Sequence, residues 1–262
     1  MLGALKPKVD TRDYKIAAGA SNFPDSWQVD YQPAVKNQKQ VNSCVAHALS
    51  TILEYFNYKE LGIKDKLSTD FIYGMQGIQY GRKEQGMYLR DACRIAKNYG
   101  DCYAATIGTN TEQPLCTELL EGKLTDKVYA EARSARVNSY ASCRDDAAIK
   151  HALMNYGPLL GSIKWYNKYE LKDGVIHMDK SSSFGYHAIM IYGWNEKGYL
   201  CQNSWGRTWN KDGSFIYPYS EKFAEAWSFV DAANDDIEIP KRNRFFDLIY
   251  KFVNSIINFF KK

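Results

Sequence analysis

The sequence predicts an α+β fold in which a helical lobe is followed by a strand-rich lobe. In the first half of the 262 residues, apolar side chains recur at the three- and four-residue spacing of helices. In the second half, short apolar or aromatic runs are separated by Gly, Asn and Asp turns, which is typical of strands. Because 45% of the residues are apolar and 15% aromatic, the chain can bury a substantial core. We therefore expect two lobes with a cleft between them.

Three helices are predicted. The first begins at Cys44 and ends before Gly62, and its apolar residues recur at helical spacing: Val45, Ala48, Leu49, Ile52, Leu53 and Phe56. A second helix is expected over residues 88–99 and is followed by Gly100. A third is expected over residues 145–156, where two aspartates suit the positive end of the helix dipole.

Short runs in the second half predict strands, and changes in composition predict domain boundaries. The expected strands are 159–163, 174–177, 188–194, 198–202 and 214–217. Residues 1–21 are polar with scattered Gly, Ala and Pro, and predict an extended N-terminal arm. Residues 22–231 are expected to form the two-lobed domain, and residues 232–262 a linker followed by a basic amphipathic helix.

The positive charge of the chain is concentrated at its C-terminal end. The formal net charge is +4, yet residues 241–262 carry six basic side chains and one acidic one. The other residues hold 28 basic and 29 acidic side chains. The body therefore offers no basic field for nucleic acid, and no nucleic-acid partner is expected.

The C-terminal segment has the pattern of an amphipathic helix. Polar residues recur by threes and fours at positions 247, 251, 254, 258 and 261, and the other face is rich in Phe, Ile, Leu and Val. Such a helix can lie on a membrane surface, with basic residues at both ends. It can equally dock on its own chain or mediate self-association. The sequence leaves these three hypotheses open.

A thiol, an imidazole and an amide occur in an order that suits nucleophilic catalysis. Cys44 lies in the predicted first turn of a helix, whose positive end favours a thiolate. A thiolate needs one group to take and return protons and another to orient that group. His187 and Asn203 follow far downstream in the strand-rich half. A single Cys followed by a distant His and Asn is a candidate nucleophile arrangement.

These motifs resemble those of the papain and cathepsin family of cysteine proteases. The matching segments occur in the family's order: Val35–Gln38, Ser43–Cys44, Tyr186–Ala188 and Asn203–Gly206. The similarity extends over about residues 22–230. It implies a papain-like two-lobe fold, with a helical left lobe, a β-barrel-like right lobe and the active site in the cleft. It also implies a cysteine endopeptidase that acts on polypeptides without a metal or organic cofactor.

The resemblance assigns roles to particular residues. Cys44 would attack the peptide carbonyl and form a thioester, while His187 exchanges protons and Asn203 orients the imidazole. The Gln38 side-chain amide would form the oxyanion hole together with the backbone N–H of Cys44. The implied substrate-binding residues are Gly86, Tyr88, Ala188 and Trp205, of which the last would cover the bond between Asn203 and His187.

Several positions depart from the family's pattern. Val41, Asn42 and Val45 stand where the family usually has a cysteine, a glycine and an aromatic residue, and His47 stands where an aromatic residue is common. Too few residues precede Cys44 for a helical prodomain. No adjacent His pair occurs near residues 74–86, which favours endopeptidase over carboxydipeptidase activity.

These departures leave alternatives open. One alternative is a binding protein of the same fold with weakened catalysis, and another is a peptide ligase or acyl transferase. His47 is a rival base one helical turn after Cys44, although a core position is the better interpretation. The arm of residues 1–21 is either a structural strap or an inhibitory segment.

The cysteines and the N-terminal residues indicate the kind of cellular compartment in which the protein is expected. Residues 1–7 lack the long apolar run of a secretory signal, and no stretch reaches the roughly 18 apolar residues of a spanning helix. If Cys44 is a working thiol, five cysteines remain, so at least one more is unpaired in a monomer. This favours a reducing compartment, although a bridge between Cys102 and Cys116 stays open. We expect an intracellular or virion-associated protein, with peripheral membrane attachment as an alternative.

Overall fold

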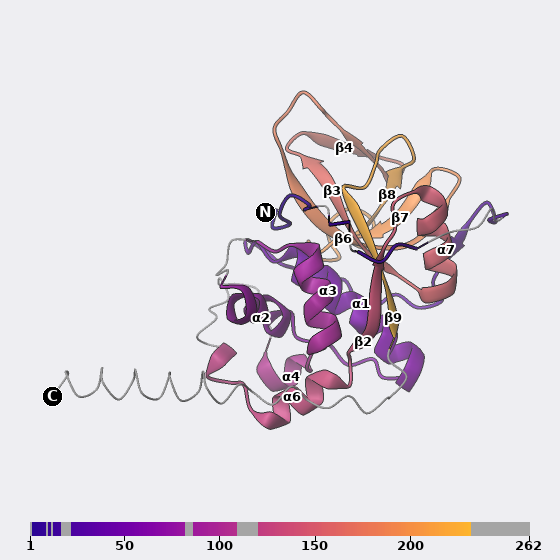
Figure 1. Ribbon diagram of the computed structural model, residues 1–262. Coiled ribbons are helices and arrows are strands. Elements are labelled where there is room, and N and C mark those ends of the chain that lie inside the picture. Colours follow the sequence, from indigo (N-terminus) through magenta and orange to yellow (C-terminus); the bar gives the residue numbers. More distant parts are fainter. Residues whose placement is uncertain are drawn as a thin grey trace. The chain divides into compact units, whose positions relative to one another are not determined.

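The computed structural model describes residues 2–8, 10–11, 13–16, 22–81, 86–108 and 120–231. Most helices gather in one lobe and most strands in the other, with one helix against the sheet (Figure 1). The helices are α1 (Cys44–Leu61), α2 (Thr69–Tyr80), α3 (Leu89–Asn98), α4 (Ala104–Ile107), α6 (Asp126–Arg133) and α7 (Asp146–Tyr156). The strands are β1 (Trp27–Gln28), β2 (Val137–Ser142), β3 (Leu159–Tyr166), β4 (Tyr169–Lys172), β5 (Val175–Met178), β6 (Phe184–Asn195), β7 (Gly198–Gln202), β8 (Ser214–Pro218) and β9 (Glu225–Asp231).

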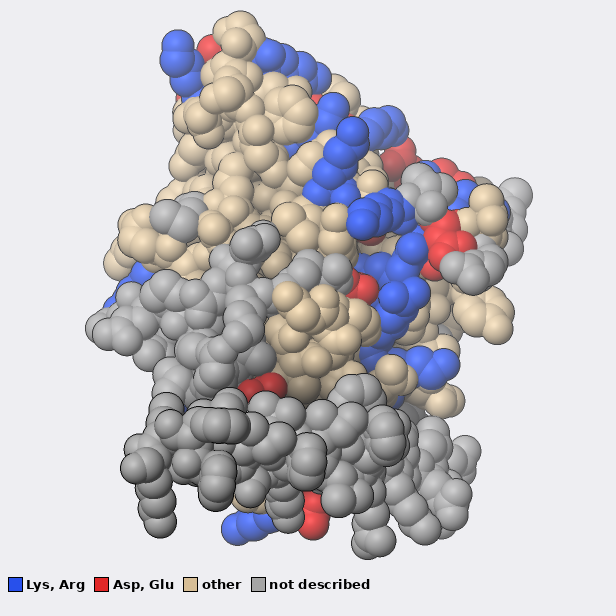
Figure 2. All heavy atoms as spheres, turned by 60° about the vertical axis from the view of Figure 1, so that its left-hand side comes forward, with Lys and Arg blue, Asp and Glu red and all other residues tan. Residues whose placement is uncertain are grey.

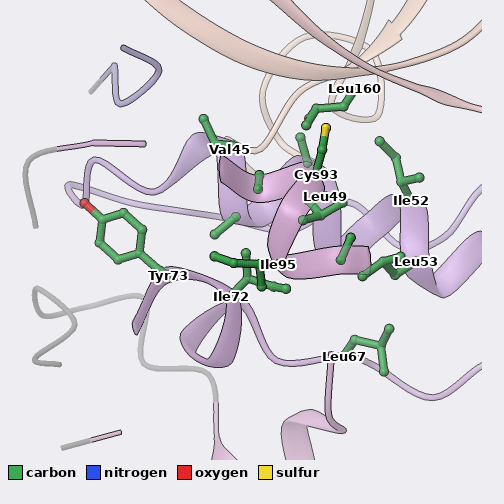
Figure 3. Packing of buried hydrophobic residues seen from close by; sticks show 14 of the residues in the cluster. Val45, Leu49, Ile52, Leu53, Leu67, Ile72, Tyr73, Cys93, Ile95 and Leu160 are labelled. Carbon is green, nitrogen blue, oxygen red and sulfur yellow. The ribbon is translucent and has the colours of Figure 1, made fainter. Parts of the chain in front are cut away.

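Helix α1 is the central element of the helical lobe. Its residue Leu49 is fully buried in one cluster with Ile72 of α2 and Ile95 of α3 (Figure 3). Burial of an aliphatic side chain of this kind contributes ~1.5–3 kcal/mol. The helix ends at Gly62, whose φ of 68° is the left-handed conformation that glycine adopts without strain. Packing thus fixes the position of the first residue of the helix, Cys44.

Strand β6 separates two hydrophobic cores. The sheet runs in the order β2-β9-β3-β6-β7-β8-β5-β4, and β1 also pairs with β6. Ala188 and Met190 belong to the core shared with the helices, whereas Ile189 and Ile191 belong to the core of the strand-rich lobe. Successive side chains of a strand point to opposite faces, so β6 is buried on both sides. This explains the continuous apolar run that predicted the strand.

The strand-rich lobe begins earlier in the chain than the sequence pattern suggested. Strand β2 precedes α7, yet it pairs antiparallel with β9, with Tyr140 opposite Phe229. The segment of β2 includes polar residues such as Asn138 and Ser139, and its partner lies at the far end of the domain. No local alternation marks it, so neither β2 nor β9 was predicted.

Some predictions fall outside the part of the chain that the structure describes. The predicted C-terminal helix within residues 241–262 is among them, so the hypotheses of membrane binding, docking and self-association stay predictions, as does the boundary at residue 232. Cys116 also lies outside the described residues. Free cysteines within the described part are Cys44, Cys93, Cys102, Cys143 and Cys201, all buried. No helix in the described ranges is long and apolar enough to cross a membrane.

Charge is unevenly spread over the surface of the described residues. Figure 2 shows Lys and Arg side chains gathered in a band along one face of the molecule. The composition of the body is close to neutral, with 28 basic and 29 acidic side chains outside residues 241–262. The band therefore comes from folding, because it brings together basic residues that the sequence distributes along the chain.

Candidate active site

Cys44 lies at the start of α1, at the positive end of the helix dipole. It is the first helical residue, and the first turn contains no acidic side chain. The preceding residue, Ser43, makes no side-chain capping hydrogen bond. The backbone N–H of Ala188 donates to Cys44 Sγ at 3.4 Å. This donor and the helix end favour a thiolate, but complete burial outweighs them and raises the pKa of the thiol.

His187 and Asn203 are joined across two neighbouring strands. Strands β6 and β7 run antiparallel with Met190 opposite Gln202, so residues before Met190 lie beside residues after Gln202. His187 Nε2 and Asn203 Oδ1 are 2.7 Å apart. The backbone N–H of Ser204 donates to the same Oδ1 at 2.7 Å, as expected for a carbonyl oxygen. Because this oxygen can only accept, Nε2 of the neutral imidazole carries the proton and Nδ1 is its basic nitrogen.

Two tryptophans enclose the imidazole of His187. The ring of Trp205 lies 4.9 Å from the imidazole, and the ring of Trp165 lies 5.2 Å from it in an edge-to-face arrangement. Burial lowers the pKa of His187 to about 4, against the opposing effect of its hydrogen bond to Asn203. Trp205 was predicted to lie here, whereas Trp165 was not. Trp165 reaches the imidazole through the pairing of β3 with β6, which leaves no mark in the local sequence.

The Gln38 amide is held in one orientation by two segments of the chain. Ser204 Oγ donates to Gln38 Oε1 at 2.6 Å, and Gln38 Nε2 donates to the carbonyl of Val41 at 2.8 Å. The backbone N–H of Gln38 also donates to the Ser204 carbonyl at 2.8 Å. Lys39 has a φ of 48°, which makes the tight turn before α1. Ser204 thus contacts both Gln38 and Asn203, a connection that sequence reasoning missed.

The thiol and the imidazole occupy neighbouring positions without a hydrogen bond between them. Ala188, which bonds Cys44 Sγ, is the residue that follows His187. His187 Nδ1 is buried and has no hydrogen-bond partner among the described residues. Burial raises the pKa of the thiol and lowers that of the imidazole, so it disfavours the charged form of both groups.

The beginning of the chain crosses this site. Ala4 forms bridges with Met87 on one side and with Tyr186 on the other. The Met87 N–H donates to the Gly3 carbonyl at 2.8 Å, and the Leu5 N–H donates to the Met87 carbonyl at 3.0 Å. Figure 1 shows the N-terminal stretch between the helices and the strands. Both Cys44 and His187 have 0% exposure.

The predicted substrate-pocket residues lie around the same crossing. Gly86 has a φ of 84° and donates its N–H to the Tyr73 hydroxyl at 3.2 Å. Tyr88 lies under the ammonium group of Lys8 at 4.6 Å, beside a cavity of about 250 Å³. Ala188 is fully buried and contacts the thiol through its backbone. The pocket roles of these residues stay predictions.

His47 is a buried residue with its own partners. Its Nδ1 lies 2.9 Å from the Ser43 carbonyl and 3.1 Å from Ser43 Oγ. Burial lowers the pKa of His47 to about 3.

His151 bonds Asn155 in α7, and His177 is exposed on β5. No cluster of His, Cys, Asp and Glu suited to a metal ion occurs in the ranges that the structure describes.

Comparison with known proteins identifies relatives in sequence and in structure. A curated relative is an uncharacterized peptidase C1-like protein of Acanthamoeba polyphaga mimivirus, 24% identical over 232 aligned residues, covering 77% of this chain and 70% of that protein. Among solved structures, xylellain, a cysteine protease from Xylella fastidiosa, has a TM-score of 0.77 at 20% identity, covering 88% of this chain and 96% of its own. Procathepsin B S9 from Trypanosoma congolense has a TM-score of 0.68 at 14% identity, covering 89% of this chain and 87% of its own.

The structural neighbours confirm the papain-like fold that the motifs predict, since their overall geometry matches despite low identity. A family model described as papain family cysteine protease matches residues 24–224, which is most of the chain. The match includes the segments of Cys44, His187 and Asn203. The chain therefore belongs to the papain family of cysteine proteases.

Proposed function

We propose that the protein is a cysteine endopeptidase whose catalytic residues are Cys44, His187, Asn203 and Gln38. The observation that carries this proposal is the bond of 2.7 Å between His187 Nε2 and Asn203 Oδ1. It leaves Nδ1 as the basic nitrogen, and the residue after His187 contacts the Cys44 sulfur. An imidazole oriented in this way beside a thiol is the arrangement that nucleophilic catalysis requires.

The reaction proceeds through a thioester. Cys44 gives its proton to His187 Nδ1, and the thiolate attacks the carbonyl carbon of a peptide bond. The negative oxygen that forms accepts hydrogen bonds from the Cys44 backbone N–H and from Gln38 Nε2. The imidazolium then protonates the leaving amine as the C–N bond breaks. Water, deprotonated by His187, hydrolyses the thioester and returns the thiol.

The arrangement also explains why Ser204 and Trp205 follow Asn203. Ser204 orients the Gln38 amide by a hydrogen bond of 2.6 Å, and Trp205 packs on the imidazole at 4.9 Å. Exclusion of water around the bond between His187 and Asn203 strengthens that bond. Ser204 and Trp205, which follow β7, thus hold the Gln38 amide and the His187 imidazole in position.

Peptide-library cleavage tests the proposal. The full chain and its Cys44→Ala variant are incubated with the library in reducing buffer. The wild type is expected to cut internal peptide bonds, and Cys44→Ala is expected to cut none. Equal cleavage by both chains would contradict the assignment of the nucleophile. Amide products formed with an added amine, in place of hydrolysis, would point to a ligase.

Gln38→Ala is expected to lower kcat by about 10²–10³-fold, because one of two donors to the oxyanion is lost. Gln40→Ala is the matched control, since Gln40 is exposed in the same loop. It is expected to leave kcat unchanged. The measurement is steady-state hydrolysis of a peptide chosen from the library, with circular dichroism to check folding. Equal kcat values for the two variants would remove Gln38 from the oxyanion hole.

A further inference from the structure

Trp165 is a buried indole that the strand register places beside the imidazole of His187. It lies on β3 and is 2% exposed. In the antiparallel pairing of β3 with β6, Trp165 is opposite Gly185, and Ile163 is opposite His187. Trp165 is therefore the diagonal neighbour of His187 on the same face of the sheet, at a separation that an aromatic side chain spans. A register shifted by one residue would turn the indole to the other face.

Three rings form a close group at the base of the proposed peptidase. The ring centroids of His187 and Trp205 are 4.9 Å apart, with an angle of 37° between the ring planes. The indole of Trp165 lies 5.2 Å from the imidazole at 75°, and 4.7 Å from the indole of Trp205 at 70°. The three centroids thus form a nearly equilateral triangle, and Trp165 is steeply inclined to both other rings. Trp205 packs on the imidazole, and Trp165 closes another side of it.

The imidazole needs this packing, because its hydrogen bonding does not fix the plane of the ring. Its Nε2 is bonded to Asn203 Oδ1 at 2.7 Å, whereas Nδ1 has no hydrogen-bond partner among the described residues. A bond at one ring atom lets the ring swing about that atom, and the torsion between Cβ and the ring of a histidine has broad energy minima. Contacts with two rings that are steeply inclined to each other restrict this torsion in more than one direction.

The indole of Trp165 is itself held by rings from other parts of the strand-rich lobe. Its further neighbours are Tyr169 of β4 at 5.1 Å, Phe215 of β8 at 5.7 Å and Trp209 at 5.9 Å. The Trp209 Nε1–H donates to the Tyr169 hydroxyl at 3.4 Å, which joins two of these neighbours. The contacts with Tyr169 and Phe215 are edge-to-face, an arrangement that aromatic rings prefer. The indole therefore has a defined position from which to restrict the imidazole.

We propose that Trp165 is a positioning residue of the peptidase, which holds the His187 imidazole in the plane that presents Nδ1 to the Cys44 thiol. This inference rests on the proposed function. Trp165 acts through His187 and takes no part in bond formation. Loss of the indole leaves a cavity into which the imidazole turns, so Nδ1 moves away from the thiol and water reaches the bond between His187 and Asn203. A displacement of about 1 Å at a reacting group can lower a rate by about 100-fold.

The test compares the full wild-type chain with its Trp165→Leu and Trp165→Phe variants in steady-state peptide hydrolysis. Trp165→Leu is expected to lower kcat by about 10- to 100-fold, because the imidazole loses its fixed plane. KM is expected to stay unchanged, since the buried indole does not contact the substrate. Trp165→Phe is expected to restore most of kcat, because an aromatic ring again packs beside the imidazole. Circular dichroism and the melting temperature check the folding of each variant.

Trp194→Leu is the matched control. Trp194 is fully buried in the same hydrophobic core as Trp165, but its ring packs on those of Trp27 and Phe23, 5.6 and 6.3 Å away. The cavity that the substitution leaves is expected to lower the melting temperature. We expect kcat per folded molecule to stay at the wild-type value.

A second readout follows the imidazole without any substrate. Each chain is labelled with ¹⁵N at its four histidines, and the Nε2–H signal of His187 is assigned by its absence in His187→Gln. In the wild type and in Trp194→Leu, the buried bond to Asn203 is expected to keep this proton visible by NMR at neutral pH. In Trp165→Leu, exchange with water is expected to remove the signal, and in Trp165→Phe the signal is expected to return.

The outcomes separate this inference from the proposed function. If folded Trp165→Leu keeps either the wild-type kcat or the wild-type Nε2–H signal, the role of Trp165 is overturned. Equal losses of kcat in Trp165→Leu and Trp194→Leu would also overturn it, because a general loosening of the core would then explain both. Loss of the Nε2–H signal in Trp165→Leu, with no hydrolysis by any chain, would support the positioning of the imidazole and overturn the proposed peptidase.

A measurement on the wild type covers the case in which Trp165→Leu does not fold. Nuclear Overhauser effects between the ring protons of Trp165 and His187 are expected, because their centroids are 5.2 Å apart. Their presence would support the packing that positions the imidazole. Their absence would overturn the inference.

Discussion

His187→Ala is expected to lower kcat/KM by about 10²–10⁴-fold, which is the contribution of a positioned general acid–base group. The imidazole is fixed by the 2.7 Å bond to Asn203, and its Nδ1 is the nitrogen that remains to exchange a proton with Cys44. Without it, neither the attack of the thiol nor protonation of the leaving amine is assisted. The measurement is peptide hydrolysis by the full chain and by the variant, with the melting temperature recorded for each.

His47→Ala is the matched control for this prediction. His47 is as buried as His187, with 1% exposure, but its Nδ1 is bonded to Ser43. We expect this variant to lose stability through the cavity that it leaves and to keep most of its activity per folded molecule. A severe loss of activity in His47→Ala with a mild loss in His187→Ala would reverse the assignment of the base.

Glu54→Ala is expected to lower the free energy of unfolding by about 3–5 kcal/mol, because it breaks a buried ion pair. Glu54 Oε1 on α1 accepts from Lys36 Nζ and, at 2.8 Å, from the Leu67 N–H. The side chains of Lys36 and Glu54 are 12% and 6% exposed. Removal of the carboxylate leaves a buried ammonium group and a buried N–H without their partner. Urea unfolding of the full chain measures the change.

An exposed pair on the same helix provides the comparison. Lys59 of α1 and Asp30 form an ion pair at 2.7 Å, but their side chains are 43% and 62% exposed. Asp30→Ala is therefore expected to leave the unfolding free energy nearly unchanged, since water screens such pairs. Lys36→Met combined with Glu54→Leu is expected to recover part of the loss, because no unpaired charge remains. Equal losses of unfolding free energy in Asp30→Ala and Glu54→Ala would show that burial of an ion pair does not increase the cost of breaking it.

The sequence by itself determined the features that depend on local patterns. The spacing of apolar residues placed a helix from Cys44 to Gly62, and the structure has α1 over Cys44–Leu61. The apolar run of residues 188–194 predicted a strand, and β6 covers Phe184–Asn195. The order of the motifs also identified the papain family, which the family match confirms. Periodicity and residue type are properties of short segments, so they can be read without a fold.

Contacts between distant residues were decided by the tertiary structure. The pairing of Met190 with Gln202 sets the strand register that brings Asn203 to His187. Strand β2 was missed because its partner, β9, lies far away in the chain. The hydrogen bond from Ser204 to Gln38 joins residues 166 positions apart. No local pattern records a register or a partner at such a separation.

The described part of the N-terminal arm shows the same division. Its polar composition predicted an extended arm and left open whether the arm inhibits. The meeting of Gly3 with Asn42, and of Ala4 with Met87 and Tyr186, depends on where the two lobes place their backbones. An extended segment has free donors and acceptors along its whole length, so its sequence does not specify the groups that it pairs with. The geometry of the folded cleft determines the groups with which the segment pairs.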